Sequence, residues 1–169
     1  MHNREIEFLS DFEVFKAGNY DYVKMCLLID GSVVGDFDQP VLYGSLELSI
    51  FDVISRLTRV NDIIFNKNAN LDDVFHMLYN AAWKEEIIAS LGKTEARFSI
   101  VDAKSSIAIP IGIETFDGEM AFYLTLGKET KFIWKDWCTK NIKSVAVDKN
   151  YLIDFYKKML FMIKAKIYP

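Results

Sequence analysis

The first third of the chain mixes apolar and polar residues in the manner of β-strands. Residues 5–15 place apolar and acidic side chains in local alternation, which predicts one strand or two short strand pieces. Residues 21–29 are rich in β-forming residues and end at Asp30 and Gly31, ahead of a second such run over 32–37. An Asp-Gly pair between two such runs predicts a tight hairpin, because a type I′ turn needs a positive φ at both central residues.

Residues 46–64 carry apolar side chains at helical spacing. These side chains form one narrow stripe, so we expect a helix that lies on a sheet or on another helix. Ser45 is the expected N-cap, since its hydroxyl can accept a hydrogen bond from a backbone N–H of the first turn. Asp52 and Arg56 fall four residues apart on the opposite face, where we expect an exposed ion pair.

Two further helices are predicted. Residues 71–90 follow Asn70, an expected N-cap, and carry two aspartates in the first turn, where the helix dipole favours anions. Residues 150–167 carry an apolar arc opposite a lysine-rich face. A terminal helix docked on the core explains this second pattern, and a basic amphipathic helix at a membrane surface is the alternative.

The remaining segments are predicted to form mainly strands, and Pro110 indicates an edge or a bulge in one of them. Together with the N-terminal runs they predict an α+β fold, in which an antiparallel sheet of roughly six to eight strands packs with about three helices. No repeat, linker or low-complexity tract interrupts the chain, so residues 1–169 are expected to form a single domain. The expected strands of this second half cover residues 96–101, 106–114, 119–126, 130–134 and 142–147.

Composition and charge narrow the class of protein. The 169 residues are 51% hydrophobic and 26% charged, which is typical of a globular protein. The net charge is −4, and a chain without a basic footprint is not expected to bind nucleic acid. The charge is uneven, because residues 1–60 hold five basic and ten acidic residues whereas residues 61–169 hold fifteen and fourteen. Such an acidic N-terminal third can steer a basic partner, and a merely solvated surface is the alternative.

The cysteines and the N-terminus indicate a cytoplasmic protein. Two cysteines, Cys26 and Cys138, are too few for a disulfide scaffold and are expected to be free thiols in a reducing compartment. The first twenty residues contain no apolar core of a secretory signal, and no apolar stretch is long enough to span a membrane. We therefore expect a cytoplasmic protein with no membrane partner.

Few residues are arranged for catalysis. His76 lies within a predicted helix among aromatic side chains, and neither it nor Cys138 has partners at the spacing of a metal or nucleophile site. The carboxylate pairs Asp36/Asp38 and Asp72/Asp73 are explained by a loop and by a helix start. We expect no catalytic residue, no metal and no cofactor. A small enzyme that uses the paired carboxylates, or Cys138 with His76, is the alternative.

Gly35, within the second strand run, predicts a bulge or a close approach of two backbones. It belongs to a longer pattern, I-D-G-x-V-V-G-D-F, followed by a short loop and a helix that opens with Ser-Leu. This pattern resembles the bacterial immunity protein 42 family, whose members are similar to small cytoplasmic antidotes encoded beside polymorphic or contact-dependent growth-inhibition toxins. The matching residues are Ile29, Asp30, Gly31, Val34, Gly35, Asp36, Phe37, Ser45 and Leu46.

The resemblance implies a role in binding a protein partner. An immunity protein neutralises a cognate toxin C-terminal domain, often a basic nuclease, by stoichiometric occlusion, and an acidic surface speeds such association. Tyrosines beside aspartates are common at interfaces, although they also pack on sheet faces. We expect a monomer or a weak homodimer; an adaptor that oligomerises through a sheet edge is a further alternative. The expected toxin contacts are Asp11, Glu13, Tyr20, Asp21, Asp36, Asp38 and Tyr43.

Overall fold

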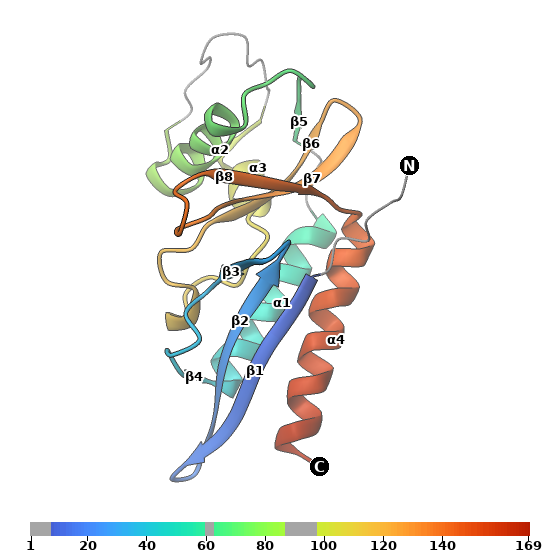
Figure 1. Ribbon diagram of the computed structural model, residues 1–169. Helices are drawn as coiled ribbons and strands as arrows, with labels where there is room; N and C mark the ends of the chain where they lie inside the picture. The colour runs from blue at the N-terminus through green and yellow to red at the C-terminus, as the bar shows by residue number, and fades with distance from the viewer. Residues whose placement is uncertain (1–7, 60–62, 87–97) are drawn as a thin grey trace. The chain divides into compact units, whose positions relative to one another are not determined.

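A computed structural model describes residues 8–59, 63–86 and 98–169 of the chain (Figure 1). The chain divides into two compact units. Unit 1 comprises residues 1–54, 110–119 and 150–169, and unit 2 comprises residues 55–109 and 120–149. The α+β class is confirmed, with eight strands in the described residues, and these strands form two four-stranded sheets. That residues 1–169 form a single domain stays a prediction.

The sheet of unit 1 is antiparallel and is built around a long hairpin. Strand β1 (Phe8–Ala17) pairs along its whole length with β2 (Tyr20–Ile29). The short strands β3 (Ser32–Val34) and β4 (Val41–Leu42) both pair with β2. Asp30 and Gly31 have φ values of 48° and 75°, so the predicted hairpin with two positive-φ residues is confirmed.

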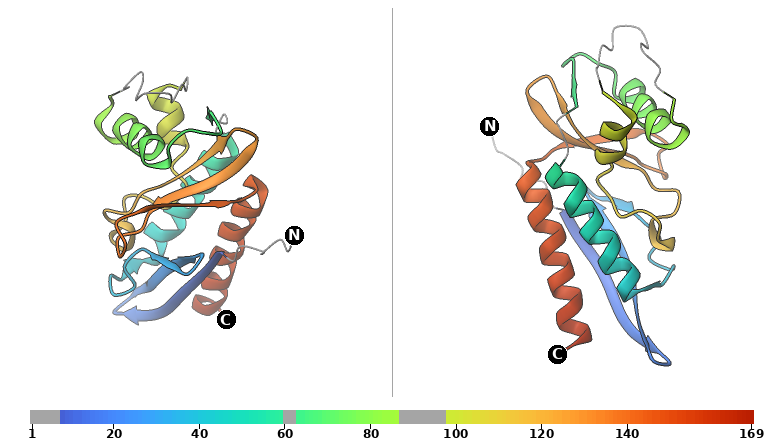
Figure 2. Two further views of the ribbon diagram at one scale, coloured as in Figure 1. Left: turned by 45° about the horizontal axis from the view of Figure 1, so that its top comes forward. Right: turned by 180° about the vertical axis from the view of Figure 1, so that it is seen from behind.

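Two helices cover one face of this sheet. Helix α1 (Tyr43–Arg59) begins in unit 1, and α4 (Lys149–Ile167) lies beside it, as Figure 2 shows from behind. Every second residue of β2 from Val23 to Ile29 is fully buried, and so are most residues of the apolar stripes of α1 and α4. The docked position of the terminal helix is therefore confirmed. Ser45 lies inside the first turn of α1 and not at its N-cap, because the helix begins two residues earlier. The buried side chains include Val23, Met25, Leu27, Leu46, Ile50, Leu152, Tyr156 and Ile163.

Unit 2 holds the second sheet. Its strands β5 (Ile64–Phe65), β6 (Ala121–Leu126), β7 (Glu129–Lys135) and β8 (Ile142–Ala146) follow that order, and only the β5–β6 pair is parallel. Helix α2 (Leu71–Tyr79) packs on this sheet, with the Phe75 and Phe122 rings 5.5 Å apart and edge to face. All three tryptophans belong to unit 2; Trp134 is fully buried, and Trp83 and Trp137 are exposed.

The N-cap predicted at Asn70 is confirmed, since its side chain accepts from the backbone N–H groups of Asp72 and Asp73. The helix itself is shorter than the predicted 71–90. It continues as a π-helical turn over Asn80–Lys84, and Glu85 ends it with a left-handed φ of 56°. Residues 87–90 lie outside the described part of the chain.

Two predicted strands are wrong. Within 96–101, residues 96–97 lie outside the described residues, and Ser99 instead caps helix α3 (Ile100–Ser105). Ser99 and Asp102 exchange hydrogen bonds in a capping box, which fixes a helix start despite the β-forming residues around it. The segment 106–114 forms only one isolated bridge, between Ile107 and Phe122. It then runs without regular structure to a 3-10 turn, η2 (Glu114–Phe116), in unit 1.

Arg56 departs from the exposed position expected for it. Its side chain is half-buried, and its guanidinium donates hydrogen bonds to the backbone carbonyls of Ile107 and Ile109, all within unit 2. Those two residues are at most 1% exposed, so the carbonyls have no ready access to water. Arg56 therefore supplies the hydrogen bonds that this irregular segment does not receive from a strand partner.

A buried aspartate organises the loop after β7 in unit 2. Asp136 is 5% exposed, and its carboxylate accepts from the Cys138 backbone N–H and from the Thr139 hydroxyl, each at 3.0 Å. Lys143 Nζ lies 2.5 Å from Asp136 Oδ2. The hydrogen bond from Lys143 is the largest cause that lowers the pKa of Asp136, from 3.8 to about 2.

This lowered pKa predicts a pH-dependent contribution to stability. A carboxyl whose folded pKa lies below its unfolded value stabilises the fold above the unfolded pKa, and the contribution is lost as pH falls through the folded pKa. We expect Asp136→Asn to lower the free energy of unfolding at neutral pH, and the difference from the wild type to vanish between about pH 4 and about pH 2. Urea unfolding of both proteins across this range measures the difference; a difference independent of pH would contradict the assignment.

Candidate functional site

The candidate residues all lie in unit 1, and two of them share one face of β1. Asp11 and Glu13 are exposed on the face of the sheet opposite the helices, because side chains alternate along a strand and their neighbours Phe12 and Val14 face the other way. On β2, Asp11 lies opposite Cys26. The pKa of the Cys26 thiol is raised, mainly by burial and further by the charge of Asp11. Both β1 carboxylates are accessible to solvent, and Lys24 of β2 lies opposite Glu13.

Asp36 and Asp38 lie in the turn between β3 and β4, and both are exposed. Asp36 has a structural part, because its Oδ1 accepts from the Asp38 backbone N–H at 3.0 Å and its own N–H donates to the Thr115 carbonyl at 2.7 Å. The Thr115 hydroxyl lies 2.8 Å from the Met25 carbonyl and 2.9 Å from that of Asp36. The turn is thus held against η2, and the Asp36 carboxylate is fixed by the Asp38 N–H.

Gly35 makes this attachment possible. Its φ is 100°, and its N–H donates to Glu119 Oε1 at 3.1 Å. A Cβ atom at this position would lie 2.9 Å from the Phe116 ring and 3.0 Å from the Thr115 carbonyl oxygen. The close approach predicted for Gly35 is confirmed, and it shows that the glycine of the I-D-G-x-V-V-G-D-F pattern has a structural role.

Tyr20, Asp21 and Tyr43 meet at one cleft. This cleft has a volume of about 660 Å³ and is lined by the end of the β1–β2 hairpin, the first turns of α1 and Tyr168 near the C-terminus. Tyr20 is 65% exposed, whereas Tyr43 is 7% exposed. Asp21 lies 3.7 Å from Lys16 Nζ. A partner can therefore reach Tyr20 and Asp21 more readily than Tyr43.

The Tyr43 hydroxyl donates to Glu47 Oε1 at 2.9 Å, and its ring meets that of Tyr168 edge to face at 6.3 Å. Burial first, and then the hydrogen bond to Glu47, raise the pKa of Tyr43 to about 12. The hydroxyl therefore stays protonated near neutral pH and acts as a hydrogen-bond donor. Tyr43 positions one wall of the cleft and offers little contact area of its own.

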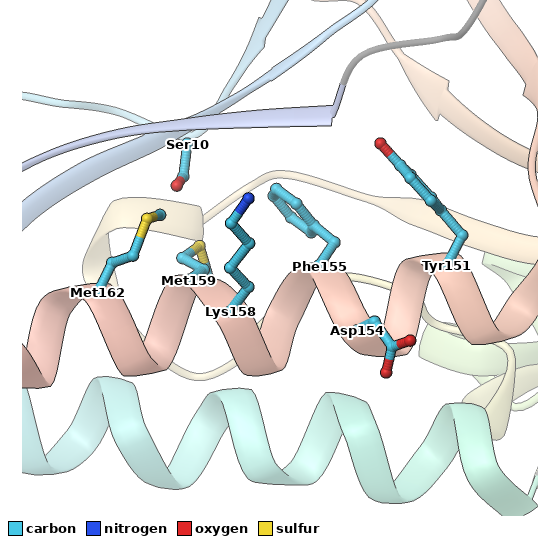
Figure 3. A pocket seen from close by; sticks show the side chains of 7 residues that line it. All are labelled: Ser10, Tyr151, Asp154, Phe155, Lys158, Met159 and Met162. Atoms are coloured by element: carbon cyan, nitrogen blue, oxygen red, sulfur yellow. The ribbon is translucent and has the colours of Figure 1, made fainter.

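Unit 1 has a second hollow, which lies between β1 and α4 and was not indicated by the sequence (Figure 3). It has a volume of about 400 Å³ and is lined mainly by apolar side chains of α4, among them Phe155, Met159 and Met162, with Ser10 of β1 opposite. Phe155 and Met162 belong to the apolar arc predicted for residues 150–167, and they are only half-buried. We call this hollow the β1–α4 groove.

The residues of the alternative enzymatic sites lie elsewhere. His76 is exposed on α2 and packs edge-on to Phe75 at 5.8 Å, and Cys138 is exposed in the loop that Asp136 organises. Asp72 and Asp73 lie in the first turn of α2, and their backbone N–H groups donate to the Asn70 side chain. In the described residues no group of three or more histidines, cysteines and acidic residues is placed to hold a metal ion. Nor does any helix there have the length and apolar character to cross a membrane.

The comparison with known families covers nearly the whole chain. A sequence profile of the family described as Immunity protein 42 matches residues 5–161. This range includes β1, the β3–β4 turn and the start of α1, and hence every candidate contact residue. No curated protein and no solved structure matches the chain.

Proposed function

We propose that this chain, which belongs to the Immunity protein 42 family, binds and neutralises the C-terminal domain of a cognate bacterial toxin by stoichiometric occlusion. The family match is the observation that carries the proposal, because it extends over residues 5–161. A family of immunity proteins suggests a binding protein without catalytic activity. We place the protein in the cytoplasm, where it would act within a polymorphic or contact-dependent growth-inhibition system.

The charge distribution supports unit 1 as the binding part. Unit 1 contains seven lysines and arginines against fourteen aspartates and glutamates, a net charge of −7. Unit 2 contains thirteen against ten, a net charge of +3. Opposite charge on a partner increases the rate of association and favours one orientation of approach. The acidic surface therefore favours a basic partner, and we propose a nuclease, whose substrate site must itself attract phosphates.

We expect the contacts to include Asp11 and Glu13 on β1, the β3–β4 turn with Asp36 and Asp38, and the cleft with Tyr20, Asp21 and Tyr43. The carboxylates would supply the long-range attraction, and Tyr20 would supply rigid contact area at low cost in side-chain entropy. The complex would need no cofactor, nucleic acid or membrane, and the free protein would be a monomer or a weak homodimer.

The test is co-expression with the toxin domain encoded beside this chain. Growth should be restored when the chain is present, and the two purified proteins should form a one-to-one complex. The Asp36→Lys/Asp38→Lys double variant should reduce the association rate about tenfold or more at low ionic strength, and the difference should shrink as salt is added. Stopped-flow binding at several salt concentrations measures this.

A charge-matched control separates local from general effects. Glu86 and Glu129 are exposed in unit 2, so Glu86→Lys/Glu129→Lys changes the net charge equally without touching the proposed surface. The association rate of this control should stay close to that of the wild type. Equal rates for all three proteins would refute the surface assignment, and a toxin that kills with or without the chain would refute the function.

A further inference from the structure

Strand β1 is the edge of its sheet. It is ten residues long and pairs with β2 along one side. Among residues 8–59, 63–86 and 98–169, no strand pairs with its other side. Because hydrogen-bonded and non-bonded pairs alternate along an antiparallel ladder, every second residue of β1 directs its N–H and C=O away from β2. These groups form a template for one more strand.

Helix α4 lies beside the open edge of β1, and the β1–α4 groove lies between them (Figure 1). Its buried residues Leu152, Tyr156 and Ile163 face the core, whereas Phe155 and Met162 are half-buried in the β1–α4 groove. In Figure 3 the side chains of Phe155, Lys158 and Met162 extend from α4 toward β1. A strand added to β1 would cover Phe155 and Met162, as β2 covers the inner stripes of the helices.

The lining of the groove suits side chains of varied shape. Met159 and Met162 are flexible and polarisable, so they can adapt to an apolar side chain that enters from an added strand. Successive side chains of that strand would point alternately into the groove and away from it. The inward positions should therefore be apolar.

The outward positions would meet the carboxylates of β1. Asp11 and Glu13 are two residues apart on the exposed face. Side chains directly opposite on neighbouring strands lie about 5 Å apart, where opposite charges attract and like charges repel. A strand added beside β1 should therefore carry lysine or arginine at the positions facing Asp11 and Glu13.

We propose that the open edge of β1 and the β1–α4 groove receive an extended segment of the toxin, with apolar and basic residues in alternation, as an additional strand of the sheet. This proposal rests on the proposed function and names the part of the partner that is bound. Backbone hydrogen bonds would provide affinity, while the groove and the two carboxylates would select the sequence.

The experiment uses the full chain and two capped peptide probes, Lys-Val-Lys-Val-Lys-Val-Lys and its counterpart with glutamate in place of lysine. In a titration followed by backbone amide NMR signals, the lysine peptide should shift signals of β1 and of α4 around Met162. The glutamate peptide should bind about tenfold more weakly or not at all. In Asp11→Lys/Glu13→Lys this preference should reverse.

Matched variants of α4 test the groove. Met162→Gln places a polar group in the groove and should weaken binding of the lysine peptide about tenfold. Phe161→Gln alters the neighbouring residue, which is 72% exposed and does not line the groove, and should change binding less than about twofold. Urea unfolding of each variant establishes that it is folded.

Three results would overturn the proposal. The first is the absence of shifts on β1, the second is a preference that does not reverse in the charge-reversed variant, and the third is equal effects of the two α4 variants. If the β1 signals shift with protein concentration in the absence of peptide, the strand that pairs with β1 is a second copy of this chain and not a toxin segment. A failed titration beside successful neutralisation in co-expression would refute this binding mode and leave the immunity function standing.

Discussion

Replacing Gly35 by valine is expected to lower the free energy of unfolding by roughly 3 kcal/mol, the sum of a strained backbone and a steric clash. The φ of 100° is readily adopted by glycine and disfavoured for a β-branched residue. The added Cβ would lie within 3.0 Å of both the Phe116 ring and the Thr115 carbonyl oxygen. Relief of this clash would separate the β3–β4 turn from η2 and break the hydrogen bond between Asp36 N–H and the Thr115 carbonyl.

Gly31 provides the matched control. Its φ is 75°, but a Cβ atom there would meet nothing within 4 Å. Gly31→Ala should therefore cost only the backbone strain, about 1 kcal/mol, whereas Gly35→Ala should cost clearly more. Urea unfolding of both alanine variants and of Gly35→Val gives the comparison. Equal losses at the two positions would show that the approach to η2 contributes nothing.

Arg56→Ala is the second substitution with a large expected effect, a loss of about 3 kcal/mol in unfolding free energy. The arginine donates to the carbonyls of Ile107 and Ile109, and its removal leaves two buried acceptors without their charged donor. Each hydrogen bond to a charged group contributes about 1.5–3 kcal/mol, and an unsatisfied buried acceptor costs a similar amount. Water that enters the space left by the side chain would reduce the loss of stability. The expected 3 kcal/mol is therefore about the lower limit for two such hydrogen bonds.

Arg59 lies three residues further along α1 and is exposed, so Arg59→Ala should change the unfolding free energy by less than about 0.5 kcal/mol. Differential scanning calorimetry of the two variants measures both effects under one condition. A loss at Arg59 as large as at Arg56 would indicate that helix propensity or net charge, and not the hydrogen bonds to the 107–109 segment, explains the change.

Local chemistry predicted the local parts of the fold. The Asp30-Gly31 turn, the cap at Asn70 and the terminal helix all depend on neighbouring residues, and each was found where the pattern placed it. The partition of eight strands into two sheets depends on contacts between distant segments, which alternation does not encode. The same holds for Arg56, whose acceptors lie 51 and 53 residues further along the chain.

The strand predicted over 96–101 failed for a different reason. β-forming residues are abundant there, but the reciprocal hydrogen bonds of Ser99 and Asp102 start a helix. The S-x-x-D spacing was visible in the sequence and is the signal that identifies such a start. In this segment a specific cap outweighs general strand propensity.

For the candidate site, the sequence indicated charge and residue type but not accessibility. The exposure of Asp11, Glu13, Asp36 and Asp38 agrees with a binding role, although their contact with a toxin stays a prediction. Tyr43 proved to be largely buried, because its ring packs on Tyr168, a residue 125 positions away. The β1–α4 groove was not predictable, since it forms where Ser10 of β1 meets side chains of α4 from the far end of the chain.

The placement of all three tryptophans in unit 2 means that indole fluorescence observes only that half of the protein. Unit 1, which carries the acidic surface and the groove, contains tyrosines and phenylalanines but no tryptophan. It therefore emits no fluorescence when tryptophan is excited selectively. Phe155→Trp would therefore introduce a fluorescent reporter into unit 1. The native tryptophans would meanwhile report whether an event there is felt in unit 2.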